Sequence, residues 1–293
     1  MQLPKLGLSL QPEQTFLDAS SPLFESGEVD VIEWSFDMCW GKTIPQPCYE
    51  LLSSYSLANN LFGHGVSFSL LIARRTARQE LWLKHLQREV EQFNYQRISE
   101  HFGFLTTDKF IQGAPMSVPY IPEMVTIGIN NLLQIKQIAN VPVGIENLGF
   151  AFSKQDVLDQ GKFITELLAA VDGYLLLDIH NIYCNMLNFD MSFDEICETL
   201  PLHRVNEIHI SGGSYRSISY QDKDIYCDSH DANIPDDVFA LLEKHLPRFP
   251  HVEVCIFERI GHTISNQYDT EQFRDDFVTL KLLIKKVWHE RND

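Results

Sequence analysis

The amino-acid sequence predicts a single (β/α)8 barrel, or TIM barrel, over residues 1–293. Eight short segments rich in Val, Ile, Leu or Phe alternate with segments of helical periodicity, which is the organisation of this fold. The segment 173–183 shows the pattern best, because four successive apolar residues precede Asp178, as in strands that are covered on both faces. His180 and Asn181 follow Asp178 at the carboxyl end of this strand. Barrels of parallel strands carry their active sites at that end.

The predicted strands share an apolar run that ends in, or is followed by, a polar residue. In chain order they are residues 6–10, 29–33, 61–67, 95–101, 143–147, 174–181, 207–211 and 252–258. Because the carboxyl ends of parallel strands meet at one mouth of a barrel, we expect these polar residues to lie close together.

The predicted helices follow the strands in order and are residues 11–24, 49–58, 74–93, 121–139, 153–170, 193–200, 236–245 and 270–289. Helix 74–93 has the clearest amphipathic stripe, which includes Leu83 and Leu86. Ser153 begins the fifth helix as a capping residue. Three longer segments, 34–47, 102–120 and 212–233, are predicted to be loops at the carboxyl end that form an open cleft.

Composition limits the possible functions. Hydrophobic residues make up 44% of the chain, which is enough to bury a large core. The net charge of −17 opposes a sequence-independent grip on nucleic acid or on an anionic membrane, because both need Lys and Arg opposite phosphates. The six cysteines contain no C-x-x-C pair, which argues against a disulfide framework or a thiolate zinc site. Without a signal-like leader or a membrane-length apolar run, the sequence predicts a cytoplasmic protein.

The polar residues at the predicted strand ends and in the loop after the seventh strand form a set of nine candidate metal ligands. They are His64, His101, Glu146, Asp178, Asn181, His209, Asp228, His230 and Glu258. Four imidazoles, four carboxylates and one amide favour zinc, iron(II) or manganese, whereas calcium and magnesium prefer oxygen ligands alone.

Nine donors exceed what one ion needs, so the set predicts two or three ions that share bridging carboxylates. We expect Glu146 to bridge a first ion, held with His64 and His101, to a second ion. The remaining donors divide between the second ion (Asp178, His209, Glu258) and a third (Asn181, Asp228, His230). The ions would also neutralise carboxylates that are costly to bury unpaired. We expect Glu146, Asp178 and His209 to be the catalytic residues.

Each candidate taken alone has an ordinary explanation. A single His after an apolar run is usually structural, and an Asp or Glu at a strand end is often a helix cap. The metal hypothesis depends on the coincidence of six successive strands, because caps do not require imidazole. His180, Glu33 and Glu100 are further candidates, either as hydrogen-bond partners of the ligands or as charge balancers.

The motifs in order resemble those of the multinuclear non-haem iron-dependent oxidative enzymes, within the xylose-isomerase-like TIM barrel superfamily. The methanobactin-biosynthesis oxidase is a well-known member. The motifs are Gly7-Leu8-Ser9-Leu10, Gly63-His64-Gly65-Val66-Ser67, Ser99-Glu100-His101, Glu146-Asn147, Leu177-Asp178-Ile179-His180-Asn181-Ile182-Tyr183, Glu207-Ile208-His209 and Asp228-Ser229-His230. His180 stands where the family often has a second Asn.

This resemblance implies two or three iron ions in mixed Fe(II)/Fe(III) states, with the nine candidates above as ligands. It also implies dioxygen as co-substrate and a cysteine-containing precursor peptide of a ribosomally made natural product as substrate. The expected product is an oxazolone with a thioamide, or a related heterocycle. Many members work with a small partner protein that recognises the leader of the peptide. Zinc or manganese would fit the same ligands as substitutes.

Two alternatives remain open: a divalent-metal hydrolase or isomerase of the same superfamily, and a barrel that binds metal without catalysis. The order of the ligands also resembles that of trinuclear zinc endonucleases, although Asn181 stands where those enzymes carry a histidine and no basic groove is evident. A sugar isomerase would use a lysine, and no predicted strand ends in one. A barrel that binds metal without catalysis would have closed coordination shells, whereas the long loops favour an open cleft.

Overall fold

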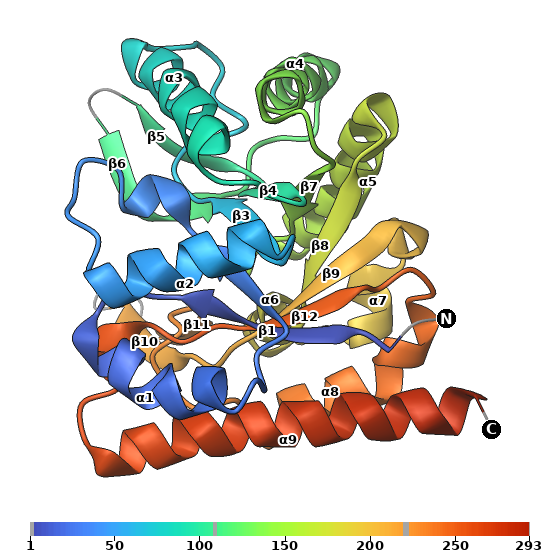
Figure 1. The fold of residues 1–293 in the computed structure, drawn as a ribbon. Coiled ribbons are helices and arrows are strands. Elements are labelled where there is room, and N and C mark those ends of the chain that lie inside the picture. The colour runs from blue at the N-terminus through green and yellow to red at the C-terminus, as the bar shows by residue number, and fades with distance from the viewer. Residues whose placement is uncertain (1–2, 108–109, 219–222, 293) are drawn as a thin grey trace.

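The computed structural model describes residues 3–107, 110–218 and 223–292. Its centre is a closed barrel of eight parallel strands, as predicted (Figure 1). The barrel strands are β1 (Lys5–Leu10), β2 (Val31–Trp34), β3 (Leu61–Gly65), β4 (Ile98–His101), β7 (Val143–Glu146), β8 (Tyr174–Asp178), β9 (Val205–Ile210) and β12 (Val254–Phe257). Neighbours pair in chain order, and β1 closes the barrel by pairing with both β2 and β12.

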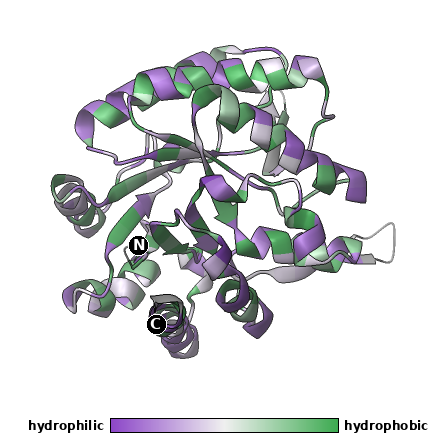
Figure 2. Cartoon of the chain, turned by 90° about the vertical axis from the view of Figure 1, so that its right-hand side faces the viewer, coloured by the Kyte–Doolittle hydropathy of each residue, from purple (hydrophilic) through white to green (hydrophobic). Residues whose placement is uncertain are grey.

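The helices surround the barrel and turn their hydrophobic residues towards it (Figures 1 and 2). They are α1 (Gln14–Glu25), α2 (Gln46–Leu57), α3 (Ala77–Gln92), α4 (Pro122–Ala139), α5 (Lys154–Val171), α6 (Ile179–Phe189), α7 (Phe193–Cys197), α8 (Asp236–His245) and α9 (Gln267–Asn292). Single 3-10 turns are η1 (Phe36–Met38), η2 (Leu202–Arg204), η3 (Leu246–Arg248) and η4 (Gly261–Thr263). Within the described ranges, no helix is long and apolar enough to span a membrane.

The predicted strand 174–181 is too long. Strand β8 ends at Asp178, and α6 begins at Ile179, so His180 and Asn181 lie in the first turn of a helix. The Asp178 carboxylate accepts a hydrogen bond from the Asn181 backbone N–H at 2.7 Å and caps this helix. Asp178 is both the last residue of the strand and the N-cap of the helix, so no turn residues mark the boundary in the sequence.

Two of the predicted loops contain antiparallel hairpins, so the prediction of irregular structure there is wrong. Strands β5 (Phe104–Thr107) and β6 (Phe110–Met116) form one, and β10 (Ser214–Ile218) and β11 (Lys223–Cys227) form the other. Pro115 lies within β6, where a two-stranded sheet leaves one backbone edge unpaired and so tolerates proline. Residues 108–109 and 219–222 lie outside the described residues. Both hairpins stand beside the carboxyl ends of the barrel strands (Figure 1).

The third predicted loop, 34–47, contains η1 and the start of α2, whose first turn includes Pro47. Asp37 of η1 fixes the segment after β3. Its carboxylate accepts hydrogen bonds from the backbone N–H groups of Val66 and Ser67, the Ser67 hydroxyl and the Trp82 indole N–H, the last at 2.8 Å. One carboxylate thus holds together a turn, a strand end and a helix.

Replacing this carboxylate therefore leaves several donors without a partner. We expect Asp37→Ala to lower the free energy of unfolding by about 2–4 kcal/mol, because hydrogen bonds to a charged group are among the stronger ones. Urea unfolding measures the change. Asp275→Ala, at an exposed position of α9, is the control and should change stability by less than about 0.5 kcal/mol. Equal small losses would contradict the role of Asp37.

Candidate metal centre

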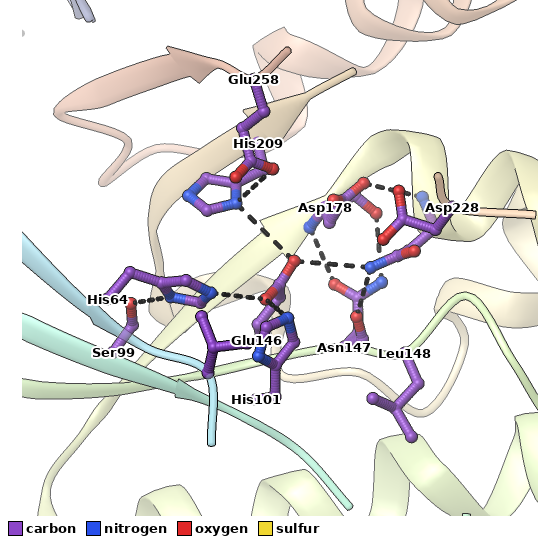
Figure 3. Close-up of polar contacts among 12 residues, drawn as sticks. His64, Ser99, His101, Glu146, Asn147, Leu148, Asp178, His209, Asp228 and Glu258 are labelled. Atoms are coloured by element: carbon purple, nitrogen blue, oxygen red, sulfur yellow. Dashed lines mark hydrogen bonds and ion pairs between the residues drawn. The ribbon is translucent and has the colours of Figure 1, made fainter. Parts of the chain in front are cut away.

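The first donor group joins the ends of three strands, with His64 from β3, His101 from β4 and Glu146 from β7 (Figure 3). The Nε2 atoms of His64 and His101 lie 3.3 and 3.0 Å from the same oxygen, Oε2 of Glu146. Ser99 Oγ contacts His64 Nδ1 at 2.7 Å. Because Ser99 occupies Nδ1, the Nε2 atom of His64 is left to face Glu146.

The second donor group shares Glu146 with the first and adds Asp178, His209 and Glu258 from β8, β9 and the end of β12. His209 Nδ1 lies 3.6 Å from Glu146 Oε1 and 3.0 Å from Glu258 Oε2. The two oxygens of Glu146 therefore face different donor groups, which is the arrangement of a bridging carboxylate. On the other side of the ring, His209 Nε2 lies 2.9 Å from Glu33 Oε2.

The third donor group shares Asp178 with the second and adds Asp228 and His230 from the segment after β11. His230 Nε2 lies 2.7 Å from Asp228 Oδ1, and His180 Nδ1 lies 3.0 Å from the same oxygen. His230 has a backbone φ of 50°. A non-glycine residue rarely adopts this left-handed conformation, and such strain tends to occur at functional sites.

Asn181 lies between the donor groups. Its Nδ2 atom donates to the Asn147 carbonyl at 2.9 Å and lies 3.4 Å from Glu146 Oε1, while its Oδ1 atom has no hydrogen-bond partner. A side chain at Gly149 would clash with this oxygen, since a Cβ there would lie 2.2 Å from it. The Asn147 side chain in turn binds both the N–H and the carbonyl of Asp178, at 2.8 and 3.1 Å.

Charge within the centre is unbalanced. The carboxylates of Glu146, Asp178 and Glu258 are nearly inaccessible to solvent, and Asp228 is only partly exposed. Within the described residues, no Lys or Arg forms an ion pair with any of them. Burying several carboxylates is costly unless cations lie beside them. Among the described groups that contact these carboxylates, only the imidazoles can take a positive charge.

The excess of buried carboxylates shifts the pKa values of the groups beside them. Burial opposes the charged form of His64, but the carboxylates of Glu33 and Glu146 outweigh it and raise the pKa to about 9. Burial and the neighbouring carboxylates, Asp228 first, raise the pKa of Asp178 well above its usual value. With protein groups alone, the raised pKa of His64 favours its positive form and the raised pKa of Asp178 favours its neutral form. A metal ion would supply that positive charge instead.

The donor atoms also fit metal ions in their placement. In each group, one atom per residue lies within 4.8 Å of all the others. Ligand atoms about 2.1 Å from a common ion lie about 3–3.5 Å apart, which matches the closest N···O distances here. Two buried donor atoms, Asp178 Oδ2 and Asn181 Oδ1, have no hydrogen-bond partner. A bound ion would account for buried polar atoms of this kind.

All nine predicted donors meet at the carboxyl end of the barrel, whereas the three predicted supporting residues have different positions. Glu33 contacts His209, and His180 contacts Asp228. Glu100 lies apart, because adjacent residues of a strand face opposite ways; its carboxylate would clash with a Cβ at Gly65, outside the barrel.

Sequence reasoning missed Ser99, Asn147 and Glu207. Side chains alternate along a strand, and this pattern would have found two of them. Ser99 lies two residues before His101 on β4, and Glu207 lies two residues before His209 on β9, so each shares the inner face of its histidine. Glu207 is buried. One donor atom each of Glu207, His209 and Glu33 lies within 4.8 Å of the other two. Asn147 follows Glu146 directly and carries no such periodic signal.

The chain is similar to proteins of known fold and family. A family model described as "RiPP precursor modification enzyme MbnB/TglH/ChrH" matches residues 25–264. A protein named only as a UPF0276 protein, from Caulobacter vibrioides (strain NA1000 / CB15N), is 27% identical over 253 residues, 85% of both chains. Another UPF0276 protein, from Shewanella sediminis (strain HAW-EB3), is 25% identical over 243 residues, 82% of both chains.

Solved structures agree on the fold. A xylose isomerase domain protein from Planctomyces limnophilus has a TM-score of 0.60 at 13% identity and covers 99% of this chain and 100% of its own. The IOLI protein with a bound zinc atom has a TM-score of 0.58 at 15% identity, with coverage of 97% and 99%. These likenesses show a xylose-isomerase-like TIM barrel and no more. The family match covers most of the chain and agrees with the motifs, so the protein belongs to the MbnB/TglH/ChrH family of RiPP precursor modification enzymes, the multinuclear non-haem iron-dependent oxidative enzymes.

Proposed function

We propose that this protein is an iron- and dioxygen-dependent oxidase that modifies a cysteine residue of a ribosomally made precursor peptide. The observation that carries the proposal is the set of three donor groups joined through Glu146 and Asp178, with no Lys or Arg paired to their carboxylates within the described ranges. Such a site suits two or three ions of a redox-active, borderline metal. Membership of a peptide-modifying family supports a peptide substrate and an enzymatic role.

The nine donors are the proposed ligands, and Glu146, Asp178 and His209 surround the reacting region. When bound, the iron ions supply the electron transfer to dioxygen and an open position for the cysteine sulfur. The protein's own residues orient the ligands. Asn147 fixes the backbone of Asp178 on both sides, and His180 holds Asp228 through a 3.0 Å contact. No side chain of the chain needs to act as a nucleophile, because the substrate supplies the sulfur.

We also propose a cytoplasmic location, where the precursor peptide is made, and a small partner protein that recognises the leader. The alternative activity, a zinc or manganese hydrolase, endonuclease or sugar isomerase, draws support only from the shared fold. The metal that the protein selects separates these two proposals.

Metal content is therefore the first prediction from the proposed function. Protein expressed in iron-supplemented cells should contain two to three irons per chain, with an antiferromagnetically coupled Mössbauer signal, and should consume dioxygen when a cysteine peptide is added. Plasma mass spectrometry and an oxygen electrode measure this. Stoichiometric zinc or manganese that iron does not displace would favour the alternative activity.

The bridging role of Glu146 gives the second prediction. Because its two oxygens face different donor groups, Glu146→Gln should weaken binding at two positions at once and remove at least one iron per chain. The thermal midpoint should then respond less to iron, since a bound ion stabilises the folded state by mass action. Asp276→Asn is a matched control, because Asp276 is a buried carboxylate on α9 that binds the Ile234 N–H. Full iron content in Glu146→Gln would refute the bridge.

Glu33 is proposed as a positioning residue for His209. Its carboxylate contacts Nε2 at 2.9 Å, which leaves Nδ1 free to bind the metal. We expect Glu33→Gln to reduce metal affinity or kcat by about 10–100-fold, with KM for the peptide little changed and an altered Mössbauer spectrum. Glu243→Gln, at a surface position of α8, should change none of these. An unchanged spectrum in Glu33→Gln would contradict the positioning role.

A further inference from the structure

The space beside the third donor group is a groove between the two hairpins. It has a volume of about 460 Å³ and is lined by Met116 of β6, Phe150 of the β7–α5 connection, Ile225 of β11 and Ile260, among others. Asp228 also lines it. The groove is therefore continuous with the proposed metal centre, and a peptide whose cysteine reaches the metal would extend into it.

The walls of this groove are mainly apolar, with one cationic side chain. Among the described lining residues, Arg216 is the only Lys or Arg. It stands on β10 opposite Ile225, in the antiparallel register that also pairs Ser214 with Cys227. Cross-strand partners share a face of a hairpin, so Arg216, Ile225 and Cys227 all belong to the face that lines the groove.

Arg216 has no anionic partner within the described part of the chain. None of the ion pairs recorded there includes it, and the nearby Asp231 is bonded to Ser214 and Ser229 at 2.8 and 2.6 Å. Arg216 does lower the pKa of Asp231, although it contributes less than the hydrogen bonds from those serines. A guanidinium with unused donors beside an apolar wall matches a ligand that carries both apolar groups and a carboxylate.

The net charge of the chain affects which ligands Arg216 can attract. At −17, the protein as a whole repels anions. An arginine with no ion-pair partner among the described residues therefore makes the groove favourable to a carboxylate that most of the surface disfavours. Complementary charge of this kind selects among partners more than it adds raw affinity.

We propose that the groove binds the part of the substrate peptide next to the modified cysteine, and that Arg216 selects a carboxylate on that part. This inference depends on the proposed peptide-modifying function. From Asp228 to Ile225, the residue opposite Arg216, the chain advances three residues, or about 10 Å at the rise of an extended strand. An extended peptide covers this distance in about three residues. The carboxylate belongs either to an Asp or Glu side chain about three residues from the cysteine, or to the end of the peptide chain.

Three synthetic cysteine peptides with blocked amino ends test this. The first carries aspartate three residues beyond the cysteine and an amidated end, the second carries asparagine there, and the third ends at that position with a free carboxylate. Their Kd values are measured by fluorescence anisotropy on iron-loaded protein without dioxygen. We expect the aspartate or the free-end peptide to bind about tenfold more tightly than the asparagine peptide, as for one charge-assisted hydrogen bond. The one that gains affinity identifies the source of the carboxylate.

Variants then assign the effect to Arg216. Arg216→Gln should abolish the preference, and Arg216→Glu should reverse it towards a peptide with lysine at that position. Arg88→Gln is the matched control, because it removes the same charge from an exposed position of α3 and should keep the preference. Iron content and circular dichroism of each variant verify folding.

The outcomes separate this inference from the proposed function. Equal affinity for the three peptides, or a preference that survives in Arg216→Gln, would overturn the inference while oxidation of the cysteine could still support the oxidase. A charge preference without dioxygen consumption would support the groove and reject the oxidase. If no peptide binds, the groove inference is wrong, whereas the oxidase proposal is decided separately by iron content and dioxygen consumption.

Discussion

The structure depends on one electrostatic constraint, which is the burial of several carboxylates at the mouth of the barrel without Lys or Arg beside them in the described residues. Glu146, Asp178 and Glu258 lie in a region from which water is largely excluded. Such a cluster is tolerable only if positive charge is brought among its members. Protonated histidines would supply some of it, and metal ions bound by the same imidazoles and carboxylates would supply more.

The barrel provides the rigidity that this cluster needs. The first donor group and most of the second draw on neighbouring strands, whose register is held by the backbone ladder, so these ligand positions are set by the same hydrogen bonds that build the fold. Side chains behind the ligands then set their orientation. Ser99 and Glu33 each occupy one nitrogen of a histidine, and Asn147 holds the backbone of Asp178. The barrel thus places the ligands, and side chains that contact them fix their orientation.

The hairpins contribute side chains to the groove beside the metal centre. The barrel strands place the proposed metal ligands, whereas β6, β10 and β11 supply side chains to the groove beside them. In barrels, chemistry at the strand ends and selectivity in the connecting segments are commonly divided in this way. The guanidinium of Arg216 forms no ion pair within the described ranges and stands on a chain of net charge −17, so it is the part of this surface with the clearest preference for a partner.

The sequence by itself predicted the barrel and placed most of the nine candidate donors at strand ends, because apolar runs and the polar residues at their ends are local signals. It did not determine the boundary at Asp178, since no turn residues separate the strand from the helix, nor the hairpins, one of which has the Gly and Pro typical of loops and the other a polar segment. Which donors form a group, the contact of Glu33 with His209 across 176 positions, and the isolation of Glu100 were decided only by the tertiary structure. The reason is physical: these distances depend on barrel closure and strand register, which no local pattern encodes.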